Sequence, residues 1–290
     1  MNSKRKIEIV IPTFNGGRKF IQVAEMLQKQ IGIKSEDVLI IDSSSSDQTV
    51  AVAENAGFRV MCIDKSDFGH GRTRRMAVEQ SQAEYIVFLT QDAIPVSNDS
   101  IIKLCEPLME NGRIGLTYGR QLPSSDVDLI GNHARLFNYP PQSQMKTKSD
   151  IPQLGIKAIF CSDSFAAYNR QYMIKLGNFM DVAFGEDTLA ADMFIKNGYG
   201  VFYNADACVY HAHSFTLFED FRRNMDIGKL HRSYCHIFSQ YGRTYGEGLR
   251  YVKSLIGFLL MQRQIRYFPF VFFHVFFRFV GYNVGKSGLF

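Results

Sequence analysis

The sequence predicts an α/β protein with a doubly wound, mostly parallel sheet, flanking helices and a helical C-terminal tail rich in basic and aromatic residues. Three short apolar runs, Ile7–Ile11, Val38–Ile41 and Tyr85–Leu89, have the composition of strands buried on both faces. Segments with helical spacing lie between them, and this alternation is typical of parallel βα units. With 290 residues, 46% of them hydrophobic, the chain can bury a substantial core.

The first half alternates strand and helix. After the strand that ends at Pro12, the sequence predicts helices and one further strand in this order: a helix over Phe20–Gln30, a helix from Asp47 to about Ala56, a strand over Arg59–Ile63 and a helix over Gly71–Gln82. Gly16 and Gly17 belong to no P-loop and no dinucleotide-binding fingerprint, so a turn accounts for them.

Two carboxylates follow strands at the same edge of this predicted sheet. Asp42 ends the second strand and Asp92 lies after Leu89, in a loop closed by Pro95. Ligands of open α/β sheets bind beyond the carboxyl ends of the strands, so we expect both acids to face one crevice. For Asp92 alone, a turn that bonds its own backbone is a slightly better explanation than a metal ligand.

Arginines at the start of a predicted helix oppose its dipole. Arg72, Arg74 and Arg75 lie in the first turns of the helix that begins near Gly71. They indicate either an anionic ligand or a solvated basic face.

The second half is less regular. A strand over Ile114–Gly119 precedes a proline-containing segment, Leu122–Ile151, which we expect to be a long mobile loop such as a lid. Phe160–Tyr168 is predicted to return near the site, with Asp163 as a turn residue or a weak acceptor-binding candidate. Short strands are predicted over Val201–Tyr203 and Ala207–Tyr210.

Further polar residues flank these later elements. Glu186 and Asp187 precede a predicted helix over Leu189–Lys196, where acids also serve as helix caps. His211 and His213 follow the last strand on one face, in reach of metal or phosphate, although a single histidine is more often structural.

Helices are predicted from Leu217 onward, and the tail is basic. From Tyr241 to Phe290 there are seven Lys/Arg and the single acid Glu247. Tyr251–Val280 is rich in Phe but interrupted by charges, so we expect it to lie on a membrane surface or to pack as an oligomerising cap. The polar N-terminus predicts a cytosolic protein, five scattered cysteines indicate neither disulfides nor zinc, and a net charge of +5 gives no reason to expect a nucleic-acid partner.

Several segments together resemble the family 2 glycosyltransferases, and among these the bacterial rhamnosyltransferases. The matching segments are Val10–Asn15, Ile41–Asp47, Phe68–Arg74, Phe88–Ala93, Phe184–Asp187 and Val209–His213. The resemblance covers most of the chain except the region 122–155 and the extreme tail. It implies a GT-A fold with a catalytic domain over 1–215, of which 1–121 binds the nucleotide-sugar and 122–215 the acceptor, and a helical membrane-associating or oligomerising region over 216–290.

The resemblance also implies roles for residues of the nucleotide-binding half. Thr13 and Asp42 would contact the nucleoside, Arg74 would lie near the base or diphosphate, and Gln91 and Asp92 would bind the nucleotide-sugar. Asp92 would hold Mg²⁺ or Mn²⁺. Many relatives carry Asp-x-Asp where this chain has Gln91-Asp92-Ala93, and one carboxylate holds such ions weakly, which makes His211 the candidate second ligand.

In the acceptor half, the resemblance implies that Asp187 is the general base of an inverting transfer, with Asp163 and Glu186 as weak acceptor-binding candidates. The expected reaction moves rhamnose from dTDP-rhamnose to a lipid-linked intermediate of O-antigen or capsule, at the inner face of the cytoplasmic membrane. Alternatives are another nucleotide-sugar transferase of this fold, a sugar-nucleotide pyrophosphorylase, or a non-catalytic membrane-bound scaffold.

Overall fold

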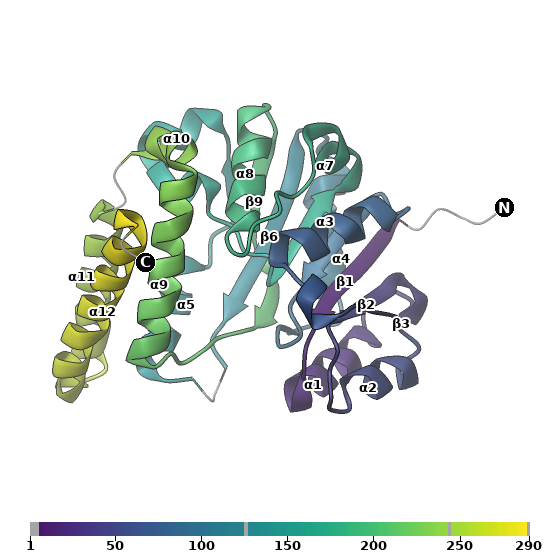
Figure 1. The fold of residues 1–290 in the computed structure, drawn as a ribbon, viewed down its shortest axis with the longest axis horizontal. Helices are drawn as coiled ribbons and strands as arrows, with labels where there is room; N and C mark the ends of the chain where they lie inside the picture. The colour runs from purple at the N-terminus through teal and green to yellow at the C-terminus, as the bar shows by residue number, and fades with distance from the viewer. Residues whose placement is uncertain (1–5, 125–126, 243–244, 289–290) are drawn as a thin grey trace. The chain divides into compact units, whose positions relative to one another are not determined.

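A computed structural model describes residues 6–124, 127–242 and 245–288 of the protein. The chain forms two compact units (Figure 1). The first comprises Met1–Leu122, Pro140–Lys148 and Ile159–His211. The second comprises Pro123–Tyr139, Ser149–Ala158 and Ala212–Phe290.

One mixed β-sheet organises the first unit. Its strands are β1 (Ile7–Thr13), β2 (Val38–Asp42), β3 (Arg59–Cys62), β4 (Tyr85–Leu89), β5 (Ile94–Pro95), β6 (Ile114–Leu122), β7 (Gln144–Lys146), β8 (Phe165–Asn169) and β9 (Gly200–Tyr210). They lie in the order β3-β2-β1-β4-β8-β6-β9-β5, and β7 pairs with β9. The first four strands are parallel, whereas β8 runs antiparallel to both β4 and β6. The predicted α/β fold is confirmed.

Helices cover both faces of this sheet. They are α1 (Gly17–Leu27), α2 (Thr49–Asn55), α3 (His70–Gln80), α4 (Ser100–Glu110), α7 (Arg170–Leu176) and α8 (Glu186–Lys196). Phe20 of α1 and Leu104 of α4 share one core cluster with Ile9 and Val87 of the sheet. Phe88, which alternates with Val87 along β4, packs its ring against Phe179 on the other face. Strands buried on both sides explain why their sequences are continuously apolar.

The second unit is helical. It contains α5 (Leu129–Asn138), α6 (Ile151–Leu154), α9 (Leu217–Ser233), α10 (Cys235–Phe238), α11 (Tyr245–Met261) and α12 (Phe268–Ser287). A small core joins Ile130 of α5 to Leu255 and Leu259 of α11 and Val271 of α12. Helix α9 begins at a capping box in which Thr216 and Glu219 bond each other's backbone N–H groups.

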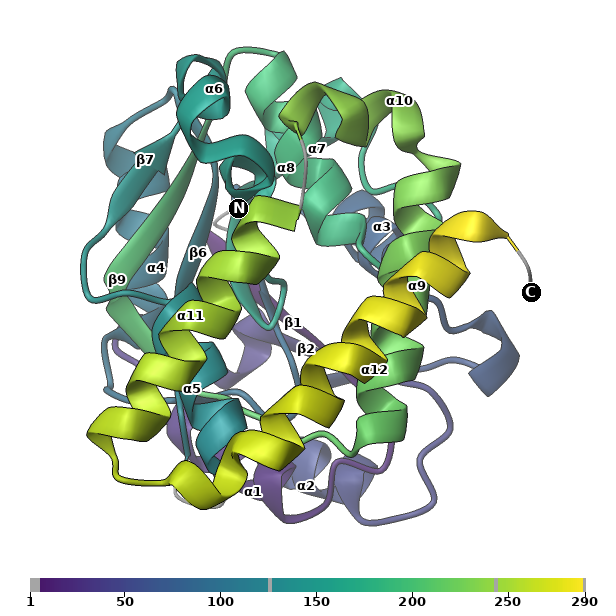
Figure 2. The ribbon, with the colours of Figure 1, turned by 90° about the vertical axis from the view of Figure 1, so that its left-hand side faces the viewer.

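Helices α9 and α12 lie side by side with their backbones close together (Figure 2). A Cβ atom added to Gly281 would lie 2.3 Å from the Phe221 carbonyl oxygen, and one added to Gly285 would lie 2.0 Å from that of Met225. Since no larger side chain fits there, these glycines set the separation of the two helices.

The structure corrects three predictions about elements. Leu122–Ile151 is not a long structureless loop: outside residues 125–126, it contains α5 and β7, and Asp128 caps α5 by accepting a hydrogen bond from the Gly131 N–H. The two predicted strands over 201–210 form one strand, β9, whose pairing with β6 is interrupted between Gly119 and Arg120. Helix α8 begins at Glu186 rather than after it, so the two acids form its first turn.

No helix among residues 6–124, 127–242 and 245–288 is both long and apolar enough to cross a membrane.

Candidate active site

The ends of β1, β2 and β4 bring three polar segments together at one edge of the sheet. Strand β1 pairs with both β2 and β4, so the loops that follow these strands are neighbours. The Gln91 amide confirms this closeness: its Oε1 accepts a hydrogen bond from the Phe14 N–H at 2.9 Å, and its Nε2 donates to the Phe14 carbonyl at 3.2 Å. Gln91 therefore braces the loop that carries Asp92 against the end of β1.

Thr13 and Asp42 are buried beneath these loops. The Thr13 hydroxyl donates to Asp42 Oδ2 at 2.7 Å, and the Ser45 hydroxyl donates to the same oxygen at 2.6 Å. The Ser45 N–H donates to Asp42 Oδ1 at 2.8 Å. Asp42 thus holds the serine-rich turn after β2 in place, with only 1% of its surface exposed.

Asp92 and His211 form the part of this edge that suits a metal ion. His211 Nε2 lies 3.4 Å from Asp92 Oδ1, and both residues belong to a group of side chains that could hold a metal ion. Two ligands at right angles on one magnesium ion would lie roughly 3 Å apart, which is close to this spacing. His213 follows two residues later, in the second unit.

Gln121 orients the His211 ring. Gln121 Nε2 donates to the Ser162 hydroxyl at 3.0 Å, so its Oε1 faces His211 Nδ1, 2.9 Å away, and accepts a hydrogen bond from it. This assignment places the Nε2 lone pair of a neutral His211 toward the Asp92 carboxylate. A carboxylate oxygen and an imidazole nitrogen are both common ligands of divalent metals, so the donor set fits such an ion.

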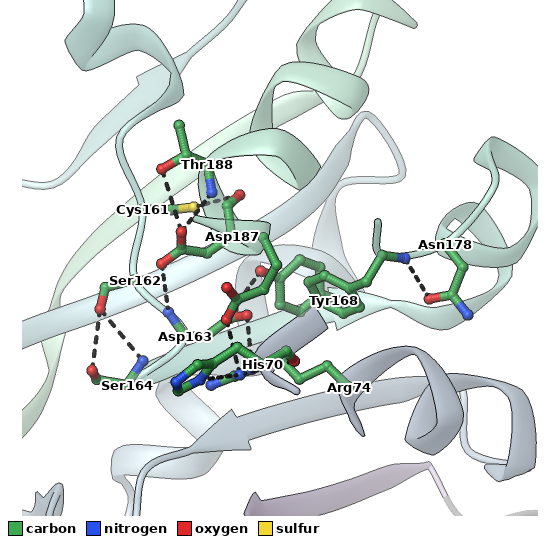
Figure 3. Close-up of polar contacts among 12 residues, drawn as sticks. His70, Arg74, Cys161, Ser162, Asp163, Ser164, Tyr168, Asn178, Asp187 and Thr188 are labelled. Carbon is green, nitrogen blue, oxygen red and sulfur yellow. Dashed lines mark hydrogen bonds and ion pairs between the residues drawn. The ribbon is translucent and has the colours of Figure 1, made fainter. Parts of the chain in front are cut away.

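Arg74 is the centre of a second, buried cluster (Figure 3). Its Nε lies 3.0 Å from Asp163 Oδ2, and its Nη1 lies 2.9 Å from Glu186 Oε1. All three side chains are almost fully buried. The Tyr168 hydroxyl donates to the other oxygen of Asp163 at 2.5 Å. Arg74 therefore ties α3 to the segment before β8 and to the start of α8.

Each arginine in the first turns of α3 is paired with an acid of the protein. Arg72 lies 3.2 Å from Asp181 and Arg75 lies 3.0 Å from Glu79, in addition to the two partners of Arg74. These pairs account for the basic cluster that opposed the helix dipole.

Asp187 differs from its neighbour Glu186 in its surroundings. Glu186 is buried against Arg74, whereas Asp187 is partly exposed. Asp187 Oδ1 accepts from the Thr188 N–H at 2.6 Å, and its Oδ2 accepts from the Asp163 N–H at 3.4 Å (Figure 3). The Asp187 carbonyl oxygen accepts from the Cys161 thiol. Asp187 is thus a half-buried residue whose carboxylate is held in place by two backbone N–H groups.

Burial and the charges of neighbouring acids raise the pKa values of Asp187 and Asp163. Burial, followed by the charge of Glu186, raises the pKa of Asp187 to about 6, although Thr188 and Arg74 act in the opposite direction. Burial also raises the pKa of Asp163 despite the attraction of Arg74. Three carboxylates surround one guanidinium here, so the cluster holds a proton more tightly than isolated acids do.

His70 adds a neutral imidazole beside Arg74. Its Nδ1 lies 3.3 Å from Arg74 Nη1, and Arg74 Nη1 also donates to the His70 carbonyl at 3.2 Å. Burial and the charge of Arg74 lower the pKa of His70 to about 4, so the ring is uncharged near neutral pH.

Gly71 allows α3 to press against the chain segment that leads to α8. Its N–H donates to the Val182 carbonyl at 3.2 Å, and an added Cβ would lie 1.9 Å from the Met180 carbonyl oxygen. The segment Phe68–Arg74 therefore holds the Glu186–Asp187 region both through backbone contact and through Arg74. These contacts explain the glycine and the arginine of that motif.

Sequence reasoning named most of these residues but not their connections. Arg74 was expected near the nucleotide, and Asp163 and Glu186 near the acceptor; the structure joins all three in one cluster. His70 and Gln121 were missed as members of the site. The available signal for His70 was its position four residues before Arg74, directly before the predicted helix over Gly71–Gln82. Gln121 had no such signal.

The fold is shared with a known class of enzyme. Solved structures of glycosyltransferases with the GT-A fold superpose on this chain. A mannosyltransferase from Pyrobaculum calidifontis, in complex with GDP-Man and Mn²⁺, has a TM-score of 0.62 at 12% identity, over 99% of this chain and 88% of its own. The S. aureus enzyme TarS (residues 1–349) has a TM-score of 0.56 at 14% identity, over 98% and 90%.

Sequence comparison identifies the glycosyltransferase family to which the chain belongs. The family model for glycosyl transferase family 2 matches residues 8–177, and the chain belongs to this family. It is 40% identical over 288 residues to the O-antigen chain rhamnosyltransferase RfbN of Salmonella typhimurium, covering 97% of this chain and 90% of the relative. It is 37% identical over 281 residues to the O-antigen chain rhamnosyltransferase WbaN of Salmonella anatum, covering 96% and 88%. The resemblance inferred from the motifs is confirmed, and the protein is a glycosyltransferase rather than a pyrophosphorylase or a scaffold.

Proposed function

We propose that this glycosyltransferase moves rhamnose from dTDP-rhamnose to a lipid-linked O-antigen intermediate, with inversion at the anomeric carbon and with the help of a divalent cation. Two relatives that align with nearly the whole chain are named as O-antigen chain rhamnosyltransferases, which supports the sugar and the acceptor class. The observation that carries the mechanism is the partly exposed Asp187 beside the buried, paired Glu186.

Asp187 is the base of the reaction. As the acceptor hydroxyl oxygen forms its bond to the anomeric carbon, the hydroxyl proton passes to the Asp187 carboxylate. The bond from the anomeric carbon to the diphosphate oxygen breaks on the opposite side, and the nucleoside diphosphate leaves with that electron pair. One displacement inverts the anomeric configuration, so no covalent intermediate and no second nucleophile is required.

Asp92 and His211 would hold the divalent cation, Mg²⁺ or Mn²⁺. The ion, when bound, offsets the charge that builds on the departing diphosphate. Gln121 supports the pair by fixing the tautomer of His211. Gln91 holds the Asp92 loop against β1, and Asp42 holds the serine-rich turn after β2, so both shape the nucleotide site.

A donor panel tests the proposal. The purified protein is incubated with dTDP-rhamnose, UDP-glucose or GDP-mannose, each with Mn²⁺ or EDTA and with a lipid-linked saccharide acceptor. We expect transfer from dTDP-rhamnose in the presence of metal, with a product anomer opposite to that of the donor. Transfer from another donor alone would overturn the rhamnose assignment, and retention would overturn the role of Asp187.

A further inference from the structure

Helix α12 has its polar and apolar faces reversed relative to an ordinary surface helix. Two polar side chains of α12 contact other helices of their unit. His274 Nδ1 lies 2.6 Å from Asp220 Oδ2 of α9, and the Arg278 guanidinium lies over the Tyr251 ring of α11. Four phenylalanines occupy the opposite face and are 50–66% exposed: Phe272, Phe273, Phe276 and Phe279. A helix that packs on a protein core and faces water normally has the opposite arrangement.

The apolar surface continues onto α11 and the turn that joins the two helices. Leu249, Ile256 and Leu260 are exposed along α11, and Met261 and Ile265 are exposed at the turn. Between the helices runs an apolar groove, lined among others by Val252 and Ile256 on one side and by Val275 and Phe276 on the other. We call α11, the turn and α12 the aromatic hairpin (residues 245–287).

Basic side chains border this apolar surface. Lys253 lies on the same face of α11 as Leu249 and Leu260, and Lys286 follows Phe279 by two helical turns on α12. Arg263 and Arg266 are exposed at the turn. The single acid of residues 245–288, Glu247, is paired with Lys157, so the hairpin presents a positive surface.

From these observations we infer that the aromatic hairpin is a membrane-docking element whose phenylalanine face enters the interface of an anionic lipid bilayer. Aromatic and aliphatic side chains would replace water with acyl chains, while the basic residues meet lipid phosphates. A second copy of the chain is a poorer partner, because a symmetric contact through this face would bring two basic borders together. The inference does not depend on the proposed donor or acceptor.

Vesicle sedimentation of the full-length protein tests the inference. Vesicles of phosphatidylcholine are compared with vesicles that also contain phosphatidylglycerol. We expect binding to the anionic vesicles that weakens with salt. Replacing two phenylalanines in Phe272→Gln/Phe276→Gln should weaken binding by at least about tenfold, because each removes a large apolar contact. The matched control, Phe218→Gln/Leu136→Gln, changes two exposed apolar residues of the same unit outside the hairpin and should bind like the unchanged protein.

A second double variant separates the contribution of the basic residues to membrane binding from that of the inserted apolar side chains. Arg263→Gln/Arg266→Gln should reduce binding to anionic vesicles by about tenfold or more and leave binding to neutral vesicles unchanged, since each basic residue near an anionic surface contributes about a fivefold gain in affinity. Equal binding of the phenylalanine pair and its control would refute the inference. The inference would also be refuted if the unchanged protein failed to sediment with anionic vesicles at low salt. If, in addition, the phenylalanine pair converted a dimer into a monomer, the hairpin would be a contact between two copies of the chain.

Discussion

Arg74 Nη1 lies 2.9 Å from Glu186 Oε1, and this ion pair distinguishes two adjacent acids that the sequence alone leaves equivalent. Glu186 is buried and neutralised by the guanidinium, while Asp187 keeps a partly exposed carboxylate with a raised pKa. This difference indicates that Asp187 accepts the proton and that Glu186 raises the pKa of Asp187.

Replacement of the base should stop transfer without disturbing the fold. Asp187→Asn keeps the size of the side chain but cannot accept the proton, so we expect kcat to fall by about 10²-fold or more with little change in KM for the donor. Initial rates and thermal melting measure both effects. The control is Asp181→Asn, an exposed acid nearby on the same segment, which should retain normal kcat. If the variant had a lower melting temperature but a normal kcat, Asp187 would serve only to stabilise the start of α8.

The pH dependence of kcat/KM should show an acid limb near pH 6. The carboxylate form of Asp187 is the active one, and it is lost as the pH falls through its raised pKa of about 6. Because Glu186 raises that pKa, Glu186→Gln should move the limb to lower pH. A limb that stays near pH 6 in this variant would show that another group titrates.

Replacing Arg74 should shift the acid limb of the pH profile in the opposite direction to Glu186→Gln. Its positive charge lowers the pKa of Asp187, so Arg74→Gln should move the acid limb to higher pH. The same change leaves Asp163 and Glu186 buried without their cation, and loss of one partner of a buried pair typically costs about 3–5 kcal/mol. The double variant Arg74→Gln/Glu186→Gln should recover part of the melting temperature and of the limb shift. Lower stability with an unmoved limb would confine Arg74 to a structural role.

Close backbone contact at α3 predicts a strong effect of a small substitution. Gly71→Ala would place a methyl group against the Met180 carbonyl, and we expect a loss of more than about 2 kcal/mol in the free energy of unfolding. The control is Gly257→Ala on α11, where an added Cβ has no neighbour within 4 Å and alanine favours the helix. Similar denaturant midpoints for both variants would contradict the described contact.

Metal binding can be measured without turnover. Titration of Mn²⁺ followed by electron paramagnetic resonance should show a site that is weakened at least about tenfold by His211→Gln or Asp92→Asn. His236→Gln, at an exposed histidine of the second unit, should leave it unchanged. Unaltered Mn²⁺ affinity in both site variants would mean that the ion binds elsewhere.

The sequence by itself determined those strands and helices whose formation depends on the spacing of apolar residues close together in the chain. Continuous apolar runs and helical spacing predicted β1, β2, β4 and the helices between them, because such strands are buried on both faces and such helices on one. The same patterns placed Asp42 and Asp92 at the same edge of the sheet, where β2 and β4 end on either side of β1. The family resemblance, carried by short motifs, extended the fold to the rest of the chain.

Only the tertiary structure decided which polar residues meet. Arg74, Asp163 and Glu186 are separated by up to 112 positions along the chain, and their pairing depends on how α3, β8 and α8 pack around the sheet. The orientation of His211 depends on Gln121, 90 residues earlier, through the parallel pairing of β6 with β9. Likewise, an apolar helix pattern shows that α12 has an apolar face, but its packing against α9 through Gly281 and Gly285 determines that the phenylalanines face outward.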